Sequence, residues 1–190
     1  MARRAGDALV QIATARLLLR EFVADDWRAV HAYQSDPRYL RFYEWSHRTE
    51  QDVRAFVGMF IGWQNETPRQ KFQLAATFQN HLIGNCGVRI KNLETHEAEI
   101  GYELNPDFWG NGYATEAARA MLAFGFRDLN LRRVTAMCVA ENHASARVLE
   151  KLGLVCEIGA PKREWFKNRW WDTLRYAISN EEWSDANRTA

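Results

Sequence analysis

The segment from residue 105 to 117 constrains this chain most, because Gly110 and Gly112 lie there between an expected strand and an expected helix. Glycine lets the backbone adopt positive φ angles and approach a ligand closely. Backbone N–H groups at the start of a helix, together with the helix dipole, favour a phosphate or pyrophosphate. Ala114 is small enough to leave such a group room. The segment predicts an anion-binding turn, with a plain structural turn as the alternative.

Two other nucleotide-binding loops do not fit this segment. A P-loop ends in Gly-Lys-Ser/Thr, which this segment lacks. A dinucleotide-binding loop needs a third glycine and an acidic residue about 20 positions later. The position of the two glycines between an expected strand and an expected helix is therefore the evidence that this segment binds an anion.

The remaining periodicities predict one central sheet flanked by helices, which is a mixed α/β (α+β) domain. Strands are expected at 16–20, 71–78, 81–90, 98–104, 133–139 and 170–178, and helices at 24–34, 49–63, 115–129 and 142–152, with an irregular aromatic stretch at 38–48. We expect a flexible N-terminal tail over 1–13, a single domain over 14–183 and a C-terminal tail over 184–190.

The composition of the chain limits the kinds of molecule that it is expected to bind. The net charge of +1 gives no basic excess, so direct nucleic-acid binding is not expected. No apolar run approaches the roughly 18 residues of a membrane span, so no membrane contact is expected. Three cysteines in apolar stretches, without paired or metal-ligand spacing, indicate buried thiols and neither a disulfide framework nor a metal site. These features predict a cytoplasmic location.

A second motif covers residues 141–154. Asn142 suits a helix N-cap, and Gly153 with Leu154 suits the helix C-terminus. Ser145, in the first turn, does not follow from capping alone.

Together these segments resemble the GNAT superfamily of acetyl-CoA-dependent N-acetyltransferases, and within it the ribosomal-protein N-terminal acetyltransferases (RimJ/RimL-like). The resemblance runs from Ala13 to about Trp183. It rests on five segments in the expected order: 14–20, 99–102, 109–117, 142–154 and 165–173.

The resemblance implies a mostly antiparallel sheet with splayed strands at an acetyl-CoA site, acetyl-CoA as co-substrate and no metal. The implied cofactor-binding residues are Leu104, Trp109, Gly110, Asn111, Gly112, Tyr113, Ala114, Thr115, Asn142 and Ser145. The pyrophosphate is expected on the N–H groups of 110–115, the pantetheine arm along the strand ending at Leu104, and Asn142 and Ser145 facing the thioester.

Two positions depart from the superfamily pattern. Trp109 replaces the usual Gln or Arg, so a polar or charged contact is missing. Leu149 replaces a tyrosine that protonates the leaving thiolate in many members, which moves that role to Ser145 or to water. The alternative for Ser145 is an ordinary hydroxyl at a helix start.

The implied reaction is direct attack of a primary amine on acetyl-CoA in a ternary complex (EC 2.3.1.-). Its catalytic candidates are Glu99 as base and Ser145 as proton donor. Glu97, Glu99 and Glu103 alternate onto one strand face, so the strand offers more than one carboxylate. The alternative is that these carboxylates are simply solvated.

The acceptor stays open at this point. A protein N-terminal α-amine demands less of a base than a lysine, because its pKa is near 8 and not near 10.4. The alternatives are a polyamine, an amino sugar or an antibiotic, or a non-catalytic coenzyme-A-binding module. The aromatic stretch 38–45, with Trp165, Phe166, Trp170 and Trp171, is expected to form the acceptor cleft or its lid, or else core and homodimer packing.

Overall fold

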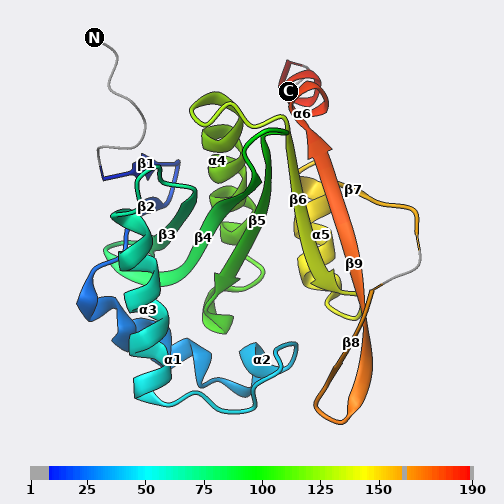
Figure 1. Ribbon diagram of the computed structural model, residues 1–190. Coiled ribbons are helices and arrows are strands. Elements are labelled where there is room, and N and C mark those ends of the chain that lie inside the picture. Colours follow the sequence, from blue (N-terminus) through cyan, green and yellow to red (C-terminus); the bar gives the residue numbers. More distant parts are fainter. Residues whose placement is uncertain (1–8, 160–161, 189–190) are drawn as a thin grey trace.

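The computed structural model describes residues 9–159 and 162–188, with side chains to residue 184, and these residues form one sheet with helices on both faces (Figure 1). The strands are β1 Gln11–Ala13, β2 Leu18–Glu21, β3 Lys71–Phe78, β4 His81–Asn92, β5 Glu97–Leu104, β6 Arg133–Val139, β7 Val155–Cys156, β8 Lys162–Phe166 and β9 Arg169–Ser179. Their order is β1-β2-β3-β4-β5-β6-β9-β7, and β8 pairs with β9. Only the pairing of β5 with β6 is parallel. The expected mixed, mostly antiparallel sheet is confirmed.

The helices divide between the two faces of the sheet. They are α1 Trp27–Gln34, α2 Pro37–Leu40, α3 Glu50–Gln64, α4 Tyr113–Arg127, α5 His143–Lys151 and α6 Asn180–Arg188, with 3-10 turns at Ala24–Asp26 and Pro106–Phe108. Because side chains alternate along a strand, Leu74 enters the larger core beneath α4, whereas Ala75 enters the smaller core beneath α1 and α3. The sheet therefore separates a larger apolar core on the α4 side from a smaller one on the side of α1 and α3.

The strands β5 and β6 part soon after they meet. Their ladder contains only Glu97 with Arg133, Ala98 with Val134 and Glu99 with Thr135. Both strands continue, β5 to Leu104 and β6 to Val139. The two ribbons diverge toward α2 in Figure 1. The expected splay is therefore present, and it opens beyond Glu99.

The caps explain most helix boundaries. Thr49 and Asp52 form a capping box at the start of α3, and Asn142 caps α5 as the sequence predicts. Helix α4 begins at Tyr113 and not at the expected 115, because Gly112 with φ +80° serves as its N-cap. Asp36 accepts a hydrogen bond from the Arg38 N–H and starts α2, so Asp36-Pro37 ends one helix and begins another.

The structure differs from the sequence analysis in four places at the chain's periphery. Residues 11–13, expected in a flexible tail, pair with β2. Helix α6 runs to 188, past the expected domain end at 183. Strand β8 was not expected, although it pairs with β9 along its whole length. Cys156 is exposed on the two-residue edge strand β7, whereas Cys86 and Cys138 are buried free thiols as expected. Residues 1–8 and 189–190 of the expected tails lie outside the described residues.

Candidate functional site

The glycine turn has the geometry of an anion-binding site. Gly110 and Gly112 both have positive φ, +81° and +80°. A Cβ added to Gly110 would meet no atom within 4 Å, so the backbone there lies open. The N-cap of the 15-residue helix α4 that follows is Gly112, which has no side chain to occupy the first N–H groups. These groups and the helix dipole can therefore bind a pyrophosphate, and that role for Gly110, Gly112, Ala114 and Thr115 stays a prediction.

Three side chains of this turn hold the turn itself. The Trp109 indole N–H donates to the Leu104 carbonyl at 2.9 Å, which closes the end of β5. Asn111 donates to the carbonyls of Phe108 and Trp109. Tyr113 is buried against Phe78, with ring centroids 5.1 Å apart. Their side chains thus have structural partners, and their contribution to an anion comes through the backbone.

Arg16 is a cation at this turn that the sequence reasoning did not single out. Its guanidinium donates to the Asn111 carbonyl at 2.9 Å, pairs with Glu116 at 2.6 Å and lies 4.5 Å from the Tyr113 ring centroid. Burial acts to raise the pKa of Glu116, but hydrogen bonds from Thr14 and Arg16 lower it overall. Arg16 is therefore held at the glycine turn as one half of an ion pair with Glu116.

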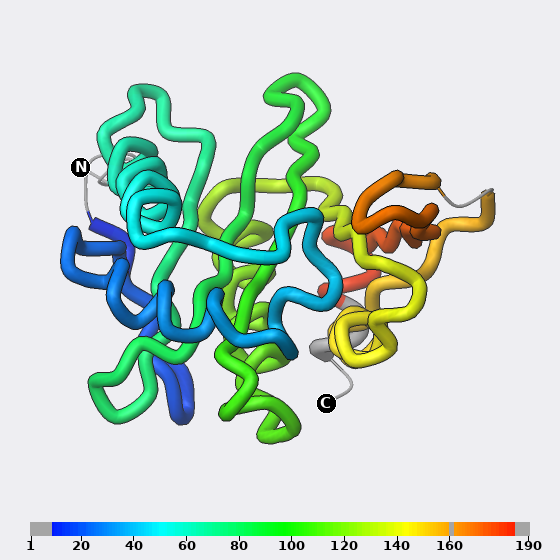
Figure 2. The backbone as a smooth tube through the Cα atoms, turned by 90° about the horizontal axis from the view of Figure 1, so that it is seen from below, coloured from blue at the N-terminus to red at the C-terminus, as the bar shows by residue number. Residues whose placement is uncertain are grey.

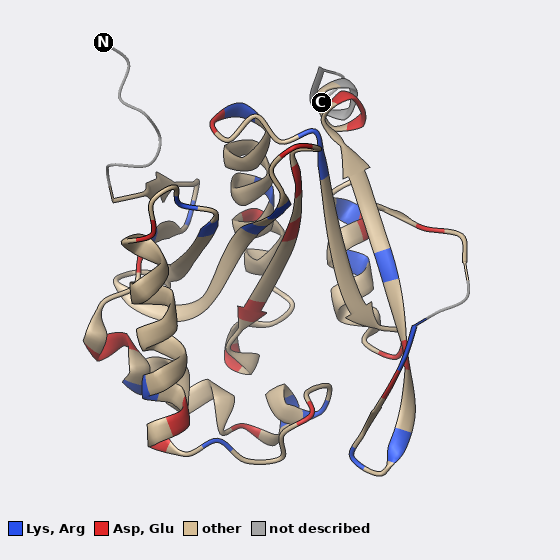
Figure 3. Ribbon diagram, viewed as in Figure 1, with Lys and Arg blue, Asp and Glu red and all other residues tan. Residues whose placement is uncertain are grey.

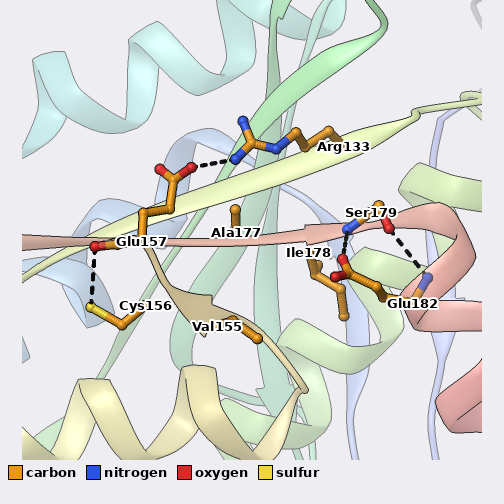
Figure 4. Close-up of a pocket in the computed structure, with 8 residues that line it drawn as sticks. All are labelled: Arg133, Val155, Cys156, Glu157, Ala177, Ile178, Ser179 and Glu182. Carbon is orange, nitrogen blue, oxygen red and sulfur yellow. Dashed lines mark hydrogen bonds and ion pairs between the residues drawn. The ribbon is translucent and has the colours of Figure 1, made fainter. Parts of the chain in front are cut away.

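Two surface hollows flank this framework. The larger, of about 860 Å³, starts at Gly112 and Thr115 and follows the outer side of α4 past Arg119 to Lys151 and Trp183. The smaller, of about 340 Å³, lies between β7, β9 and α6 and includes Arg133, Glu157 and Cys156 (Figure 4). Only the larger hollow contains residues of the glycine turn, so it is the one continuous with the expected pyrophosphate position.

Ser145 lies opposite β5 across the splay. The Tyr102 hydroxyl lies 2.9 Å from Ser145 Oγ and donates to the Ser145 carbonyl at 3.0 Å. Burial raises the pKa of Tyr102, so its hydroxyl is neutral at ordinary pH. Asn142 Oδ1 accepts from the Ser145 N–H at 3.2 Å and so caps α5, and the predicted contact of Asn142 with the co-substrate stays a prediction. The buried Leu149 carries no proton donor.

Glu99 lies where the splay begins, but its carboxylate is already paired. Arg89 lies 3.0 Å and Lys91 3.4 Å from its oxygens. Burial acts to raise the pKa of Glu99, yet the Arg89 and Lys91 cations outweigh it and hold that pKa below its ordinary value. Glu99 is therefore ionised and a weak proton acceptor.

Glu103 lies further along the same face of β5 and has different partners. Its Oε2 accepts from the Tyr33 hydroxyl at 3.1 Å and from the Gln34 and Asn85 amides at 3.0 Å each. Within the described residues it forms no salt bridge. Burial and the neighbouring Glu103 raise the pKa of Tyr33, so this hydroxyl stays a neutral donor.

A continuous polar network connects the two carboxylates beneath this face. Arg89 donates to Glu99 and, at 2.9 Å, to Gln73, whose amide donates to Asn85 at 2.6 Å. Asn85 then donates to Glu103. Gln73 and Asn85 are almost fully buried. Acidic positions recur along β5 in Figure 3, but this network gives them unequal surroundings.

The aromatic stretch forms a strap across the open end of the splay. Arg38 pairs with Asp107 at 2.7 Å on the β5 side. The Lys167 ammonium donates to the Leu40 carbonyl at 2.6 Å, and Phe42 meets Trp171 edge-on at 6.0 Å, on the β8–β9 side. Figures 1 and 2 both show this segment passing beneath the ends of the central strands.

The expected aromatic residues divide into buried and exposed sets. Tyr39 and Trp171 are buried, whereas Trp165 and Trp170 expose more than half of their surface on the outer side of the hairpin. The buried residues therefore build the wall of the splay, and the exposed pair lies away from it.

A family model for the acetyltransferase (GNAT) domain matches residues 16–155, which include the splay, the glycine turn and Ser145. The chain belongs to the GNAT acetyltransferase family. It is 40% identical over 175 residues to YnaD of Bacillus subtilis (strain 168), an uncharacterized N-acetyltransferase, covering 92% of this chain and 100% of YnaD. A GNAT-family acetyltransferase from Bacillus anthracis has a TM-score of 0.78 at 36% identity, covering 90% and 99%.

More distant GNAT structures share the fold and differ in acceptor. One is RimL, a ribosomal L7/L12 α-N-protein acetyltransferase in complex with coenzyme A, with a TM-score of 0.78 and 20% identity, covering 90% and 98%. Another is the spermidine N-acetyltransferase from Vibrio cholerae in complex with coenzyme A and spermine, with a TM-score of 0.76 and 19% identity, covering 90% and 99%. At such identity the likeness shows the fold alone.

Family membership makes this GNAT protein an acetyl-CoA-dependent N-acetyltransferase, which confirms the expected enzyme class and co-substrate. The part of the chain that the structure describes contains no group of three or more His, Cys, Asp and Glu side chains suited to a metal ion. None of its helices combines the length and apolar character needed to cross a membrane.

Proposed function

We propose that this GNAT enzyme acetylates the α-amine of a peptide or protein N-terminus, in the manner of the RimJ/RimL-like branch. The observation that carries this proposal is the pairing of Glu99 with Arg89 and Lys91. A carboxylate with a lowered pKa accepts protons poorly. An α-amine with a pKa near 8 is roughly one-tenth deprotonated at pH 7 and needs little help from a base, unlike an aliphatic amine near 10.4.

The residues of the splay have assigned roles in this proposal. The N–H groups of 110–115 bind the pyrophosphate, and the backbone of β5 up to Leu104 binds the pantetheine arm. Ser145 Oγ gives its proton to the coenzyme A thiolate as the C–S bond breaks, and at the same time takes a proton from a water molecule. The Tyr102 hydroxyl, 2.9 Å away, holds the Ser145 hydroxyl in place. Glu99 or a water molecule takes the proton released by the attacking amine.

Direct transfer fits the state of the nearby thiol. Cys138 is buried on β6, and burial raises the pKa of its thiol to about 11. A thiol of that pKa is neutral at pH 7 and is a poor nucleophile, because the thiolate is the reactive form. The chemistry therefore favours attack of the amine on acetyl-CoA in a ternary complex over an acetyl-cysteine intermediate.

The decisive test measures coenzyme A release as free thiol across a panel of amines. The panel contains short peptides with free and with blocked N-termini, spermidine and an aminoglycoside. Turnover that requires a free peptide α-amine supports the proposal. Turnover only on small amines would show that the acceptor is a small amine, while the acetyl-transfer reaction stays as proposed. If acetyl-CoA binds but no amine is acetylated, the chain acts as a coenzyme-A-binding module.

Location and assembly belong to the same proposal. We place the enzyme in the cytoplasm, where acetyl-CoA and nascent N-termini meet, and fractionation of cells tests this. We also propose a homodimer through the hairpin face that carries the exposed Trp165 and Trp170. Light scattering of the wild type and of W165S/W170S tests the dimer, and a monomeric wild type contradicts it.

A further inference from the structure

Glu103 differs from the paired carboxylates of the cleft, because its known partners are all neutral. Three side-chain donors converge on Oε2, and no donor to Oε1 is found within the described residues. Gln34, which provides one donor, is fully buried, and its own Oε1 has no hydrogen-bond partner. One carboxylate oxygen is thus fixed in direction while the other is left for a cation.

The position of Glu103 along β5 matches the proton donor. Glu103 is the neighbour of Tyr102, which contacts Ser145. Glu99 lies three residues before Tyr102, or about 10 Å along an extended strand. Because successive side chains on a strand point to opposite faces, a cation bound at Glu103 lies at the level of Ser145 along β5 but on the other face of the sheet, next to α1.

We propose that Glu103 binds the ammonium group of the acceptor on arrival, before Glu99 or a water molecule removes its proton, and that the cleft selects acceptors with a single positive charge. This inference rests on the proposed function and adds a recognition residue to it. The described partners of Glu103 are neutral donors and not cations, whereas Glu99 is already paired with two cations.

The surrounding charges disfavour a polyamine. Toward the closed end of the splay, Arg89 and Lys91 both pair with Glu99. On the strap and hairpin, Arg41 lies over the Phe42 ring and Lys167 donates to a carbonyl, and neither pairs with a carboxylate within the described residues. A second ammonium on the acceptor meets these cations, whereas an acidic residue next to the acetylated one is attracted to them.

The test uses the full chain with saturating acetyl-CoA and the variant E103Q, which removes the charge and keeps the size. Acceptors are the peptide amides Ser-Ala-Phe-Ala, Ser-Asp-Phe-Ala and Ser-Lys-Phe-Ala, and spermidine. We expect E103Q to raise the KM for Ser-Ala-Phe-Ala by about 10- to 100-fold, the range for a lost charge-assisted hydrogen bond. The KM for acetyl-CoA should stay unchanged.

Two controls separate recognition from folding. E97Q changes a carboxylate on the same strand face, in the part of β5 that still pairs with β6, and should leave both KM values unchanged. A peptide with a trimethylated N-terminus carries the cation but cannot be acetylated, so it should inhibit the wild type competitively against the acceptor. The N-acetylated peptide should inhibit at least 10-fold more weakly, which tests the inference even if E103Q does not fold.

The outcomes are distinguishable. An unchanged acceptor KM in folded E103Q, or equal inhibition by the trimethylated and acetylated peptides, overturns the role of Glu103. A preference for spermidine or Ser-Lys-Phe-Ala over Ser-Asp-Phe-Ala overturns the single-charge selection. If the wild type acetylates none of the amines, the proposed function fails. Calorimetry with the trimethylated peptide then still shows whether Glu103 binds a cation.

Discussion

Glu99 and Glu103 occupy the same face of the same strand, four residues apart, yet the protein treats them in opposite ways. Glu99 is held by two cations and has a lowered pKa, whereas Glu103 is held by a tyrosine and two amides. A carboxylate that is paired with cations has its charge balanced within the protein. A carboxylate that accepts hydrogen bonds from neutral donors is held in one orientation, but its charge is not balanced by these partners. The comparison teaches that strand alternation selects a face, and that partners from other elements decide what each carboxylate on it can do.

The largest effect is expected from removing Asn85, which contacts Glu103 directly and reaches Glu99 only through Gln73 and Arg89. N85A removes one of three donors to Glu103 and leaves the buried Gln73 amide without this partner, at a cost of about 2–3 kcal/mol. Thermal melting should show a fall in Tm of about 4–10 °C, together with a raised acceptor KM. R89M is the matched change at the Glu99 end and should leave the acceptor KM near the wild-type value. Equal changes of the acceptor KM in N85A and R89M would contradict the proposed difference between Glu103 and Glu99.

A smaller effect is expected from Y33F, which removes one of three donors to Glu103 and keeps the ring. The acceptor KM should rise about 3- to 10-fold, the loss of one hydrogen bond to a charged group shared with two others. Initial-rate kinetics with Ser-Ala-Phe-Ala measure this. Y43F is the control, because Tyr43 stacks on Tyr39 and donates no hydrogen bond to Glu103. A larger effect from Y43F than from Y33F would contradict the assignment.

E99Q tests the other carboxylate. Because the lowered pKa makes Glu99 a weak base, kcat should fall by no more than about 10-fold, and the acceptor KM should hardly change. The stability should depend on pH with a defined sign. A depressed pKa stabilises the fold above the ordinary pKa of Glu99, and this contribution is lost as pH falls through the lower folded-state value. Urea unfolding between pH 3 and 6 should show that dependence in the wild type and less of it in E99Q. A kcat loss of 1,000-fold would make Glu99 the essential base.

The smallest effect is expected from Gly101→Ala, which separates the two ends most cleanly. A Cβ at Gly101 would lie 2.7 Å from Nη2 of Arg89, the flexible end of that side chain, so the guanidinium must move. Weakening its contact with Glu99 should raise the pKa of Glu99 and shift the acidic limb of the kcat–pH profile upward. The acceptor KM should stay constant, because Glu103 keeps its partners. A changed acceptor KM with an unshifted kcat–pH profile would show that the substitution affects Glu103 and not Glu99, which would contradict this prediction.

Much of the fold and of the co-substrate site could be predicted from local sequence. The glycine turn, the caps at Thr49 and Asn142 and the span of β5 depend on residues close together in the chain, and the structure has them where expected. The strap was harder, because Asp36-Pro37 ends one helix and also begins another. Strand β8 carries charged residues and gains its order only from pairing with β9.

The acceptor side could not be predicted in the same way. Glu103 lies 70 residues from Tyr33 and 18 from Asn85, and alternation contains no information about which donors meet it. Arg16 reaches the glycine turn across 95 residues, from the loop between β1 and β2. Both features depend on long-range packing, which periodicity does not encode.

The early end of the β5–β6 ladder leaves an edge strand in the interior of a sheet. From Ile100 to Leu104, β5 is paired with β4 on one side and has no strand on the other. Such an edge is usually a hazard for aggregation, and proteins normally cover it. In the proposed complex the pantetheine arm would take the place of the missing strand, so acetyl-CoA would complete the sheet as well as take part in the reaction. Amide hydrogen exchange in this stretch should slow when the co-substrate binds, and the enzyme without it should be the form that aggregates first on heating.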